Sequence, residues 1–292
     1  MPVSKIRGVN INWQTIGDDG PSKGPWVVMT SGGRRSYQEF IPLANKIAAY
    51  GYRVLLHDRR NTGASEVLIE GDEGEEIPWT RDMFELTSQQ NIQPAFFCGS
   101  SSGARTSILF YLRYPQAVRG LLLMRVTGGA FAAGRLPENY YGQFIRAAQQ
   151  GGMAAVCATE QWQERIAANP STRDRLMAMP PEKFIDVMTR WNEIFVAGGK
   201  YPVMGVSEAD LRSLKVPTMI IPGNDNTHAG PSALFAHNAI AGSELHRLPI
   251  EDQDVPLIPF PEWGPQEAEI ARTFADFMAR TIAAEAKQPI SA

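Results

Sequence analysis

The sequence predicts an α/β fold, in which a mainly parallel sheet of about eight strands carries helices on both faces. Short apolar runs alternate with segments of helical periodicity along most of the 292 residues, and such alternation is typical of parallel sheets. Residues 130–210 interrupt this rhythm, because they contain several helical patterns and no convincing strand. We therefore expect a core formed by residues 1–129 and 211–292, with a helical insertion over residues 130–210.

The individual elements follow from local patterns. Residues 6–13 alternate between apolar and polar side chains, which predicts an antiparallel edge hairpin. Helical periodicity appears over residues 40–47, before a stop at Gly51, and again over residues 266–285. The remaining predicted strands are short and apolar, and they comprise residues 26–29, 52–56, 94–97, 120–124, 216–221 and 243–248.

Composition limits the possible partners and compartment. The formal net charge of −3 gives no electrostatic reason to expect nucleic acid, and the acidic run over residues 70–76 is typical of a solvated loop. Cys98 and Cys157 lie far apart, so a disulfide scaffold is not expected and a reducing compartment fits. No apolar run is long enough to span a membrane. We expect a cytoplasmic monomer or homodimer that binds a small-molecule substrate, without membrane, metal or cofactor.

The most informative motif is Gly99-Ser100-Ser101-Ser102-Gly103. It follows the apolar residues 94–97 and precedes a helical pattern over residues 104–112. In this strand–turn–helix context, Gly-x-Ser-x-Gly predicts a nucleophile elbow, where glycines allow a sharp turn that exposes the serine hydroxyl. The alternative is a turn rich in serine and glycine that has no chemical role.

With this motif, three further segments make the chain resemble the α/β-hydrolase superfamily over nearly its whole length. Ser31-Gly32-Gly33 is similar to the oxyanion turn of that family. Residues 58–65 look like its Asp-x-Arg-Gly-x-Gly-x-Ser turn, with Asn61 in place of a glycine. Residues 214–225 look like the strand that delivers the catalytic acid. The combination is specific for the fold and does not identify a substrate.

The resemblance implies roles for four residues. Acyl transfer at a serine requires a base, an acid that orients the base, and N–H groups directed at the developing oxyanion. Ser101 matches the nucleophile and Asp225 the acid, while the backbone N–H groups of Gly33 and Ser102 match the oxyanion donors. Alternatively, Asp225 is only a loop residue in a Gly-Asn-Asp turn.

The chain departs from the family pattern at the histidine. In the family this residue follows the last strand, but residues 249–255 contain none. Gln253 is nearest to the expected position, and its neutral amide cannot accept a proton.

Of the four histidines, His228 remains as the candidate base, because it lies three residues after Asp225 at the functional edge of the sheet. Strands lie about 4.8 Å apart, and the acid strand is nearer the nucleophile strand than the usual histidine strand is. An imidazole of ordinary pKa would make activity rise through about pH 6–7. A structural or substrate-contacting role for His228 is the alternative.

Three other residues are candidates for substrate binding. Arg34 follows the oxyanion turn, and Arg125 follows an apolar strand at its carboxyl end. A guanidinium there suits a carboxylate or enolate, although Arg125 could instead pair with an acidic residue of the insertion. Trp191 belongs to the aromatic residues of the insertion, whose simplest role is to hold that segment together.

These observations predict a hydrolase that acts on a small ester, a lactone or a carbon–carbon bond through Ser101, in a pocket covered by a helical lid. The missing histidine keeps a non-hydrolytic alternative open. In that case the same pocket would serve a small-molecule binding protein, a lyase or a cofactor-free oxygenase.

Overall fold

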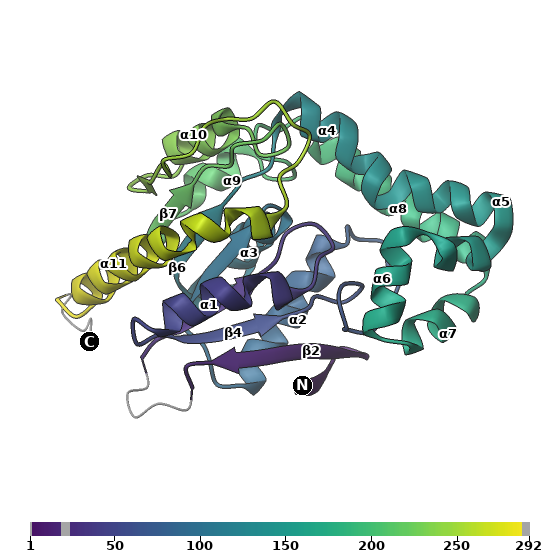
Figure 1. Ribbon diagram of the computed structural model, residues 1–292, viewed down its shortest axis with the longest axis horizontal. Coiled ribbons are helices and arrows are strands. Elements are labelled where there is room, and N and C mark those ends of the chain that lie inside the picture. The colour runs from purple at the N-terminus through teal and green to yellow at the C-terminus, as the bar shows by residue number, and fades with distance from the viewer. Residues whose placement is uncertain (1, 19–23, 288–292) are drawn as a thin grey trace.

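An eight-stranded, mostly parallel sheet forms the centre of the molecule in the computed structural model, which describes residues 2–18 and 24–287 (Figure 1). The strand order is β1-β2-β4-β3-β5-β6-β7-β8, and only β1 and β2 pair in antiparallel fashion with their neighbours. The predicted fold class is therefore confirmed. The strands are β1 (Val3–Ile6), β2 (Val9–Ile16), β3 (Trp26–Thr30), β4 (Arg53–His57), β5 (Ala95–Ser100), β6 (Val118–Met124), β7 (Thr218–Ile221) and β8 (Glu244–Leu245).

Strand β8 is shorter than the sequence pattern predicts. It ends at Leu245, so His246 lies beyond the strand and not within it. The amide of His246 still donates to the carbonyl of Ile220 at 2.9 Å, but Pro249 follows closely and has no N–H to extend the ladder. A long loop therefore follows β8 and leads to the last helix.

Helices cover both faces of the sheet. One face packs against α1 (Ile41–Ala48) and α11 (Glu267–Glu285), which lie side by side in Figure 1. The other face packs against α2 (Glu76–Gln89), α3 (Ser102–Arg113), α9 (Glu208–Ser213) and α10 (Gly230–Ala239). Short 3-10 turns occupy Tyr37–Phe40, Pro115–Ala117 and Phe260–Gln266.

The acidic run over residues 70–76 is not simply a solvated loop. Glu75 and Glu76 are 1% and 9% exposed and lie at the start of α2. Each pairs with a buried arginine, Glu75 with Arg34 and Glu76 with Arg105. The expectation fails for these two residues because their partners come from distant parts of the chain.

Between β6 and β7 the chain forms a group of helices, drawn in teal in Figure 1 and called here the helical insertion. A separate apolar cluster holds it together, and this cluster includes Phe144, Trp162 and Trp191. One isolated bridge, between Val203 and Val206, is the β-structure described in this segment. The helices are α4 (Gly129–Pro137), a π-helix (Glu138–Gly142), α5 (Gln143–Ala158), α6 (Glu160–Ala168), α7 (Ser171–Met177) and α8 (Pro181–Gly198).

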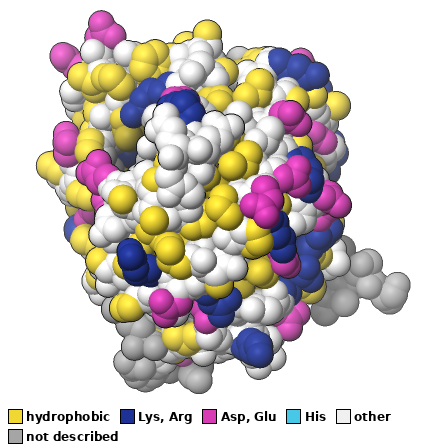
Figure 2. Space-filling view, turned by 90° about the vertical axis from the view of Figure 1, so that its right-hand side faces the viewer, with side chains coloured by type: hydrophobic (Ala, Val, Ile, Leu, Met, Phe, Trp, Pro, Cys, Tyr) yellow, Lys and Arg dark blue, Asp and Glu magenta, His cyan; other side chains and the backbone are white. Residues whose placement is uncertain are grey.

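On the side of the molecule shown in Figure 2, acidic and basic side chains lie interspersed among apolar ones. None of the described helices combines the length and apolar character that crossing a membrane requires.

Candidate active site

The turn between β5 and α3 holds Ser101 in an unusual backbone conformation, with φ 57° and ψ −119°. Non-glycine residues adopt a positive φ rarely, and such strain is concentrated at functional sites. The flanking glycines permit the turn. A Cβ at Gly99 would lie 2.2 Å from the carbonyl carbon of Gly103, and one at Gly103 would lie 2.1 Å from the carbonyl oxygen of Thr30. The motif therefore requires glycine at both positions.

Ser101, His228 and Asp225 form one continuous chain of hydrogen bonds. Ser101 Oγ lies 2.8 Å from His228 Nε2. On the other side of the ring, His228 Nδ1 lies 2.9 and 3.0 Å from the two carboxylate oxygens of Asp225. Both residues follow β7, which is separated from β5 only by β6. The strand order thus explains how a histidine on the acid's own loop contacts the serine.

The hydrogen bonds define the tautomer of His228. Because Asp225 is an acceptor when ionised, Nδ1 must carry the ring proton and donate it to the carboxylate. Nε2 is then free to accept from the hydroxyl of Ser101. Thr127 Oγ1 lies 3.1 Å from Ser101 Oγ and can donate to it in turn. This is the arrangement in which a histidine can take the serine proton.

The electrostatic surroundings shift both titratable groups. Burial would raise the pKa of Asp225, but hydrogen bonds from His228 and Ile258, with the positive charge of Arg125, hold this pKa well below its usual range. Burial, with a smaller contribution from the Arg125 charge, lowers the pKa of His228 from 6.5 to about 4 against the opposing effect of Asp225. The ordinary histidine pKa expected from the sequence is therefore wrong for this environment.

Arg125 is bound to Asp225. Its Nη2 donates to Asp225 Oδ2 at 2.8 Å and to the carbonyl of Ile258, and lies 3.2 Å from His228 Nδ1. The side chain is 3% exposed, and its guanidinium lies 5.2 Å from the ring centre of Trp263. The sequence offered Arg125 as a substrate contact or as the partner of an acid in the insertion. Its ion-pair partner is Asp225 and not an acid of the insertion, because β6 and β7 are neighbours, and the residue also lines the cavity that contains Ser101.

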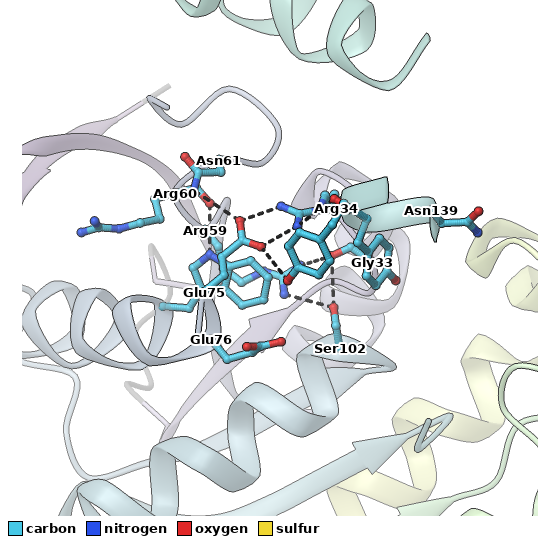
Figure 3. Close-up of polar contacts among 12 residues, drawn as sticks. Gly33, Arg34, Arg59, Arg60, Asn61, Glu75, Glu76, Ser102 and Asn139 are labelled. Carbon is cyan, nitrogen blue, oxygen red and sulfur yellow. Dashed lines mark hydrogen bonds and ion pairs between the residues drawn. The ribbon is translucent and has the colours of Figure 1, made fainter. Parts of the chain in front are cut away.

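The two expected oxyanion donors lie on neighbouring loops that Arg59 joins. Arg59 Nη2 donates to the carbonyl of Gly33 at 2.7 Å, and Nη1 donates to Ser102 Oγ at 3.1 Å (Figure 3). Ser102 Oγ itself donates to the Gly33 carbonyl at 3.1 Å. The N–H of Ser102 opens α3, where it has no partner within the helix. Sequence reasoning gave Arg59 no role, although it lies in the turn over residues 58–65.

Replacing Arg59 by methionine is expected to lower kcat about ten-fold and to change KM little, because misplaced oxyanion donors weaken transition-state binding. Steady-state kinetics on an activated ester, a substrate type that the sequence predicts, measures this effect. The matched control is Arg60→Met, which breaks a buried ion pair with Asp82 on the far side of the turn. An equal loss of kcat in both variants would indicate a general defect in folding rather than a role in positioning.

Arg34 also forms an ion pair within the protein. It forms an ion pair with Glu75 at 2.5 Å (Figure 3). Its guanidinium also lies 5.4 and 5.2 Å from the ring centres of Tyr140 and Tyr141. Asn61, which replaces a family glycine, has φ 66° and donates to Glu75 at 3.3 Å. Asparagine tolerates this conformation better than most residues, so the substitution preserves the turn and adds a contact.

The side chain of Ser101 lies at the wall of a cavity of about 400 Å³. Ser101, His228 and Arg125 line one side, and the loop after β8 adds residues 257–261. The helical insertion lines the other side with Arg135, Leu136, Asn139, Tyr140, Glu160, Gln161, Glu164 and Arg165.

Two residues considered from the sequence lie outside this cavity. Trp191, a candidate for substrate binding, is 2% exposed and packs in the apolar cluster of the insertion. Gln253 is exposed, and its backbone N–H donates to the carbonyl of Asn224. Among the described residues, no group of three or more histidine, cysteine, aspartate or glutamate side chains could hold a metal ion.

A family model described as "Serine aminopeptidase, S33" (Hydrolase_4) matches residues 22–194, more than half of the chain. The chain belongs to this α/β-hydrolase family. A curated relative, the "Uncharacterized hydrolase YraK" of Bacillus subtilis, is 30% identical over 120 residues. That match covers 40% of this chain and 41% of the relative.

Solved structures of α/β-hydrolases share the fold of this family member. The enol-lactonase from Burkholderia xenovorans is 18% identical with a TM-score of 0.64, over 95% of this chain and all of the other. The meta-cleavage product hydrolase from Pseudomonas fluorescens is 16% identical with a TM-score of 0.62, over 96% of this chain and 98% of the other. At these identities the likeness concerns the fold alone.

Proposed function

We propose that the protein is a serine hydrolase that uses Ser101 as nucleophile, His228 as general base and Asp225 as the acid that orients the histidine. The observation that carries the proposal is the 2.8 Å contact between Ser101 Oγ and His228 Nε2. A nucleophile within hydrogen-bond reach of a base, itself oriented by a third group, is the signature of nucleophilic catalysis. The position of His228 also supports hydrolysis over a non-hydrolytic use of the pocket, since a base lies beside the serine.

In this mechanism Ser101 Oγ attacks the substrate carbonyl carbon while its proton passes to His228 Nε2. The N–H groups of Gly33 and Ser102 stabilise the resulting oxyanion. The intermediate collapses when the bond to the leaving group breaks and His228 returns the proton to that group. A water then attacks the acyl-enzyme and gives a proton to His228. The second intermediate collapses when its bond to Ser101 Oγ breaks and His228 returns that proton to the oxygen, which releases the acid and regenerates Ser101.

The substrate class that fits is a small ester, a lactone or the carbon–carbon bond of an activated ketone. A cavity of about 400 Å³ is at the small end of ligand sites. We propose that the helical insertion acts as a lid, because it forms the wall of the cavity opposite Ser101. The enol-lactonase and the meta-cleavage product hydrolase share the fold, so lactones and meta-cleavage products are suitable first substrates to assay.

A fluorophosphonate probe tests whether the serine is activated. We expect the probe to label Ser101, as determined by peptide mapping, and to label the His228→Ala variant far more slowly. Labelling of another serine, or no labelling of the folded protein, would contradict the proposed mechanism.

The pH dependence follows from the pKa shift of His228. Catalysis needs the neutral imidazole, so kcat/KM should fall as the pH drops through about 4, and not through the ordinary value of 6.5. Arg125→Met should move this limb to higher pH, because it removes a positive charge that disfavours the imidazolium. The measurement is kcat/KM from pH 3.5 to 8, with fluorescence to monitor folding.

Glu39 provides the control for this profile. It lines the cavity, and burial raises its pKa to about 7. An inflection near pH 7 that disappears in Glu39→Gln belongs to Glu39. A limb between pH 6 and 7 that persists in Glu39→Gln would show that His228 titrates normally, against the expectation.

A further inference from the structure

Arg165, on helix α6 of the insertion, is a buried cation without an adequate partner. The residue is 4% exposed, and it lines the cavity that contains Ser101. Its Nε and Nη1 atoms are buried and have no hydrogen-bond partner among the described residues. Nη2 lies 3.5 Å from Gln161 Oε1, and the guanidinium lies 4.3 Å from the ring centre of Trp162. A guanidinium has five N–H donors, so most of its capacity is unused.

Two carboxylates, those of Glu75 and Glu164, act on the Arg165 charge, and both are bound to other arginines. Glu75 pairs with Arg34, and Glu164 pairs with Arg35 at 3.1 Å. Burial foremost, and then the positive charge of Arg34, lower the pKa of Arg165 to about 9 in spite of these two carboxylates. This part of the cavity wall thus has a positive charge that the protein itself does not neutralise.

Several other charged residues line the cavity, and of these Arg34, Arg35 and Arg125 are each paired with a carboxylate. Arg135 of α4 adds a further positive charge to the lining. Glu39 also lines the cavity, but its raised pKa leaves it partly protonated near neutral pH. Glu160 and Glu164 are exposed on helix α6. Around Arg165 the positive charges therefore outweigh the negative ones, and the cavity wall there favours an anionic ligand.

A buried, unpaired charge is costly, and proteins retain one where a ligand supplies the missing partner. An arginine presents parallel N–H groups that match the two oxygens of a carboxylate. We propose that Arg165 binds a carboxylate of the substrate, so that the enzyme hydrolyses compounds that carry an acid group in addition to the bond cleaved at Ser101. This inference rests on the proposed hydrolase function and narrows its substrate class.

A matched pair of esters tests the preference for an anion. The mono-4-nitrophenyl esters of glutaric, adipic and pimelic acid carry a free carboxylate at three distances from the ester. The 4-nitrophenyl esters of the corresponding monoamides have the same shape without the charge. We expect wild-type kcat/KM to favour the carboxylate at least five-fold at one or more of these lengths. A ratio below five at every length would overturn the proposal.

Variants assign the preference to Arg165. In Arg165→Met the ratio should fall below two, whereas in Arg146→Met it should stay at the wild-type value. Arg146 is a matched control, because it is an exposed arginine of the insertion that pairs with Glu138. A ratio that persists in Arg165→Met would overturn the proposal. Since the methionine removes an unpaired buried charge, the melting temperature of this variant should equal or exceed that of the wild type.

Binding separates this inference from the hydrolase function. If no ester is turned over, the proposed function fails, and the carboxylate site is judged by ligand binding alone. In the Ser101→Ala variant, glutarate, adipate or pimelate should raise the melting temperature, and the added Arg165→Met change should abolish this rise. Absence of a rise with all three dicarboxylates would then refute the site.

Discussion

Ser101→Ala is expected to fold normally and to hydrolyse its substrate on the order of a thousand-fold or more slowly, as when other triad nucleophiles are truncated. Among the described residues, the hydroxyl oxygen forms hydrogen bonds with His228 and Thr127 alone, so the substitution removes the nucleophile and little packing. Kinetics at saturating enzyme, together with thermal unfolding, measures both properties. The melting temperature should not fall, because hydroxyls held at active sites rarely add stability.

A serine on helix α3, which follows Ser101, provides the control for Ser101→Ala. Ser107 donates its hydroxyl to the carbonyl of Gly103, one turn earlier in α3. Ser107→Ala should therefore retain the wild-type rate. If Ser101→Ala kept more than a tenth of that rate, the chemistry would have to lie at another residue.

The sheet could be predicted because its central strands are continuous apolar runs. Every residue of β3, β5 and β7 is buried, so periodicity and length were sufficient to locate them. Helix α2 was missed although Trp79, Met83 and Leu86 recur at helical spacing on one buried side. The preceding glutamates suggested a loop, and their buried arginine partners, Arg34 and Arg105, are distant in the sequence.

The site was predictable only where a local motif or the strand order carried the information. The Gly-x-Ser-x-Gly turn identified Ser101, and the order of strands made His228 a candidate. The Arg59 bridge between two loops and the pairing of Arg125 with Asp225 depend on tertiary neighbours. The lowered pKa of His228 depends on burial and on Arg125. For Trp191 the sequence suggested a site residue that the structure places in the apolar core of the insertion. Aromatic residues on a helix belong to the core more often than to a binding site.

The largest remaining effect concerns the proton acceptor. His228→Ala is expected to lower kcat about a thousand-fold or more, because Ser101 would lose the group that accepts its proton. His237→Ala and His246→Ala should retain the wild-type rate. His237 is bound to Ser243, and His246 to Glu269, outside the cavity.

The companion variant is Gln253→His, which restores the family's usual histidine. We expect no gain in esterase activity from it, because residue 253 is exposed and does not line the cavity, and Ser101 already has a base at 2.8 Å. Assays of both variants on one activated ester discriminate between the two mechanisms. If His228→Ala loses esterase activity and Gln253→His gains none, the general base has been relocated to the loop after β7 that also carries Asp225. Retention in His228→Ala with a gain in Gln253→His would instead indicate a hydrolase that has lost its base, with His228 serving only to hold the loop after β7.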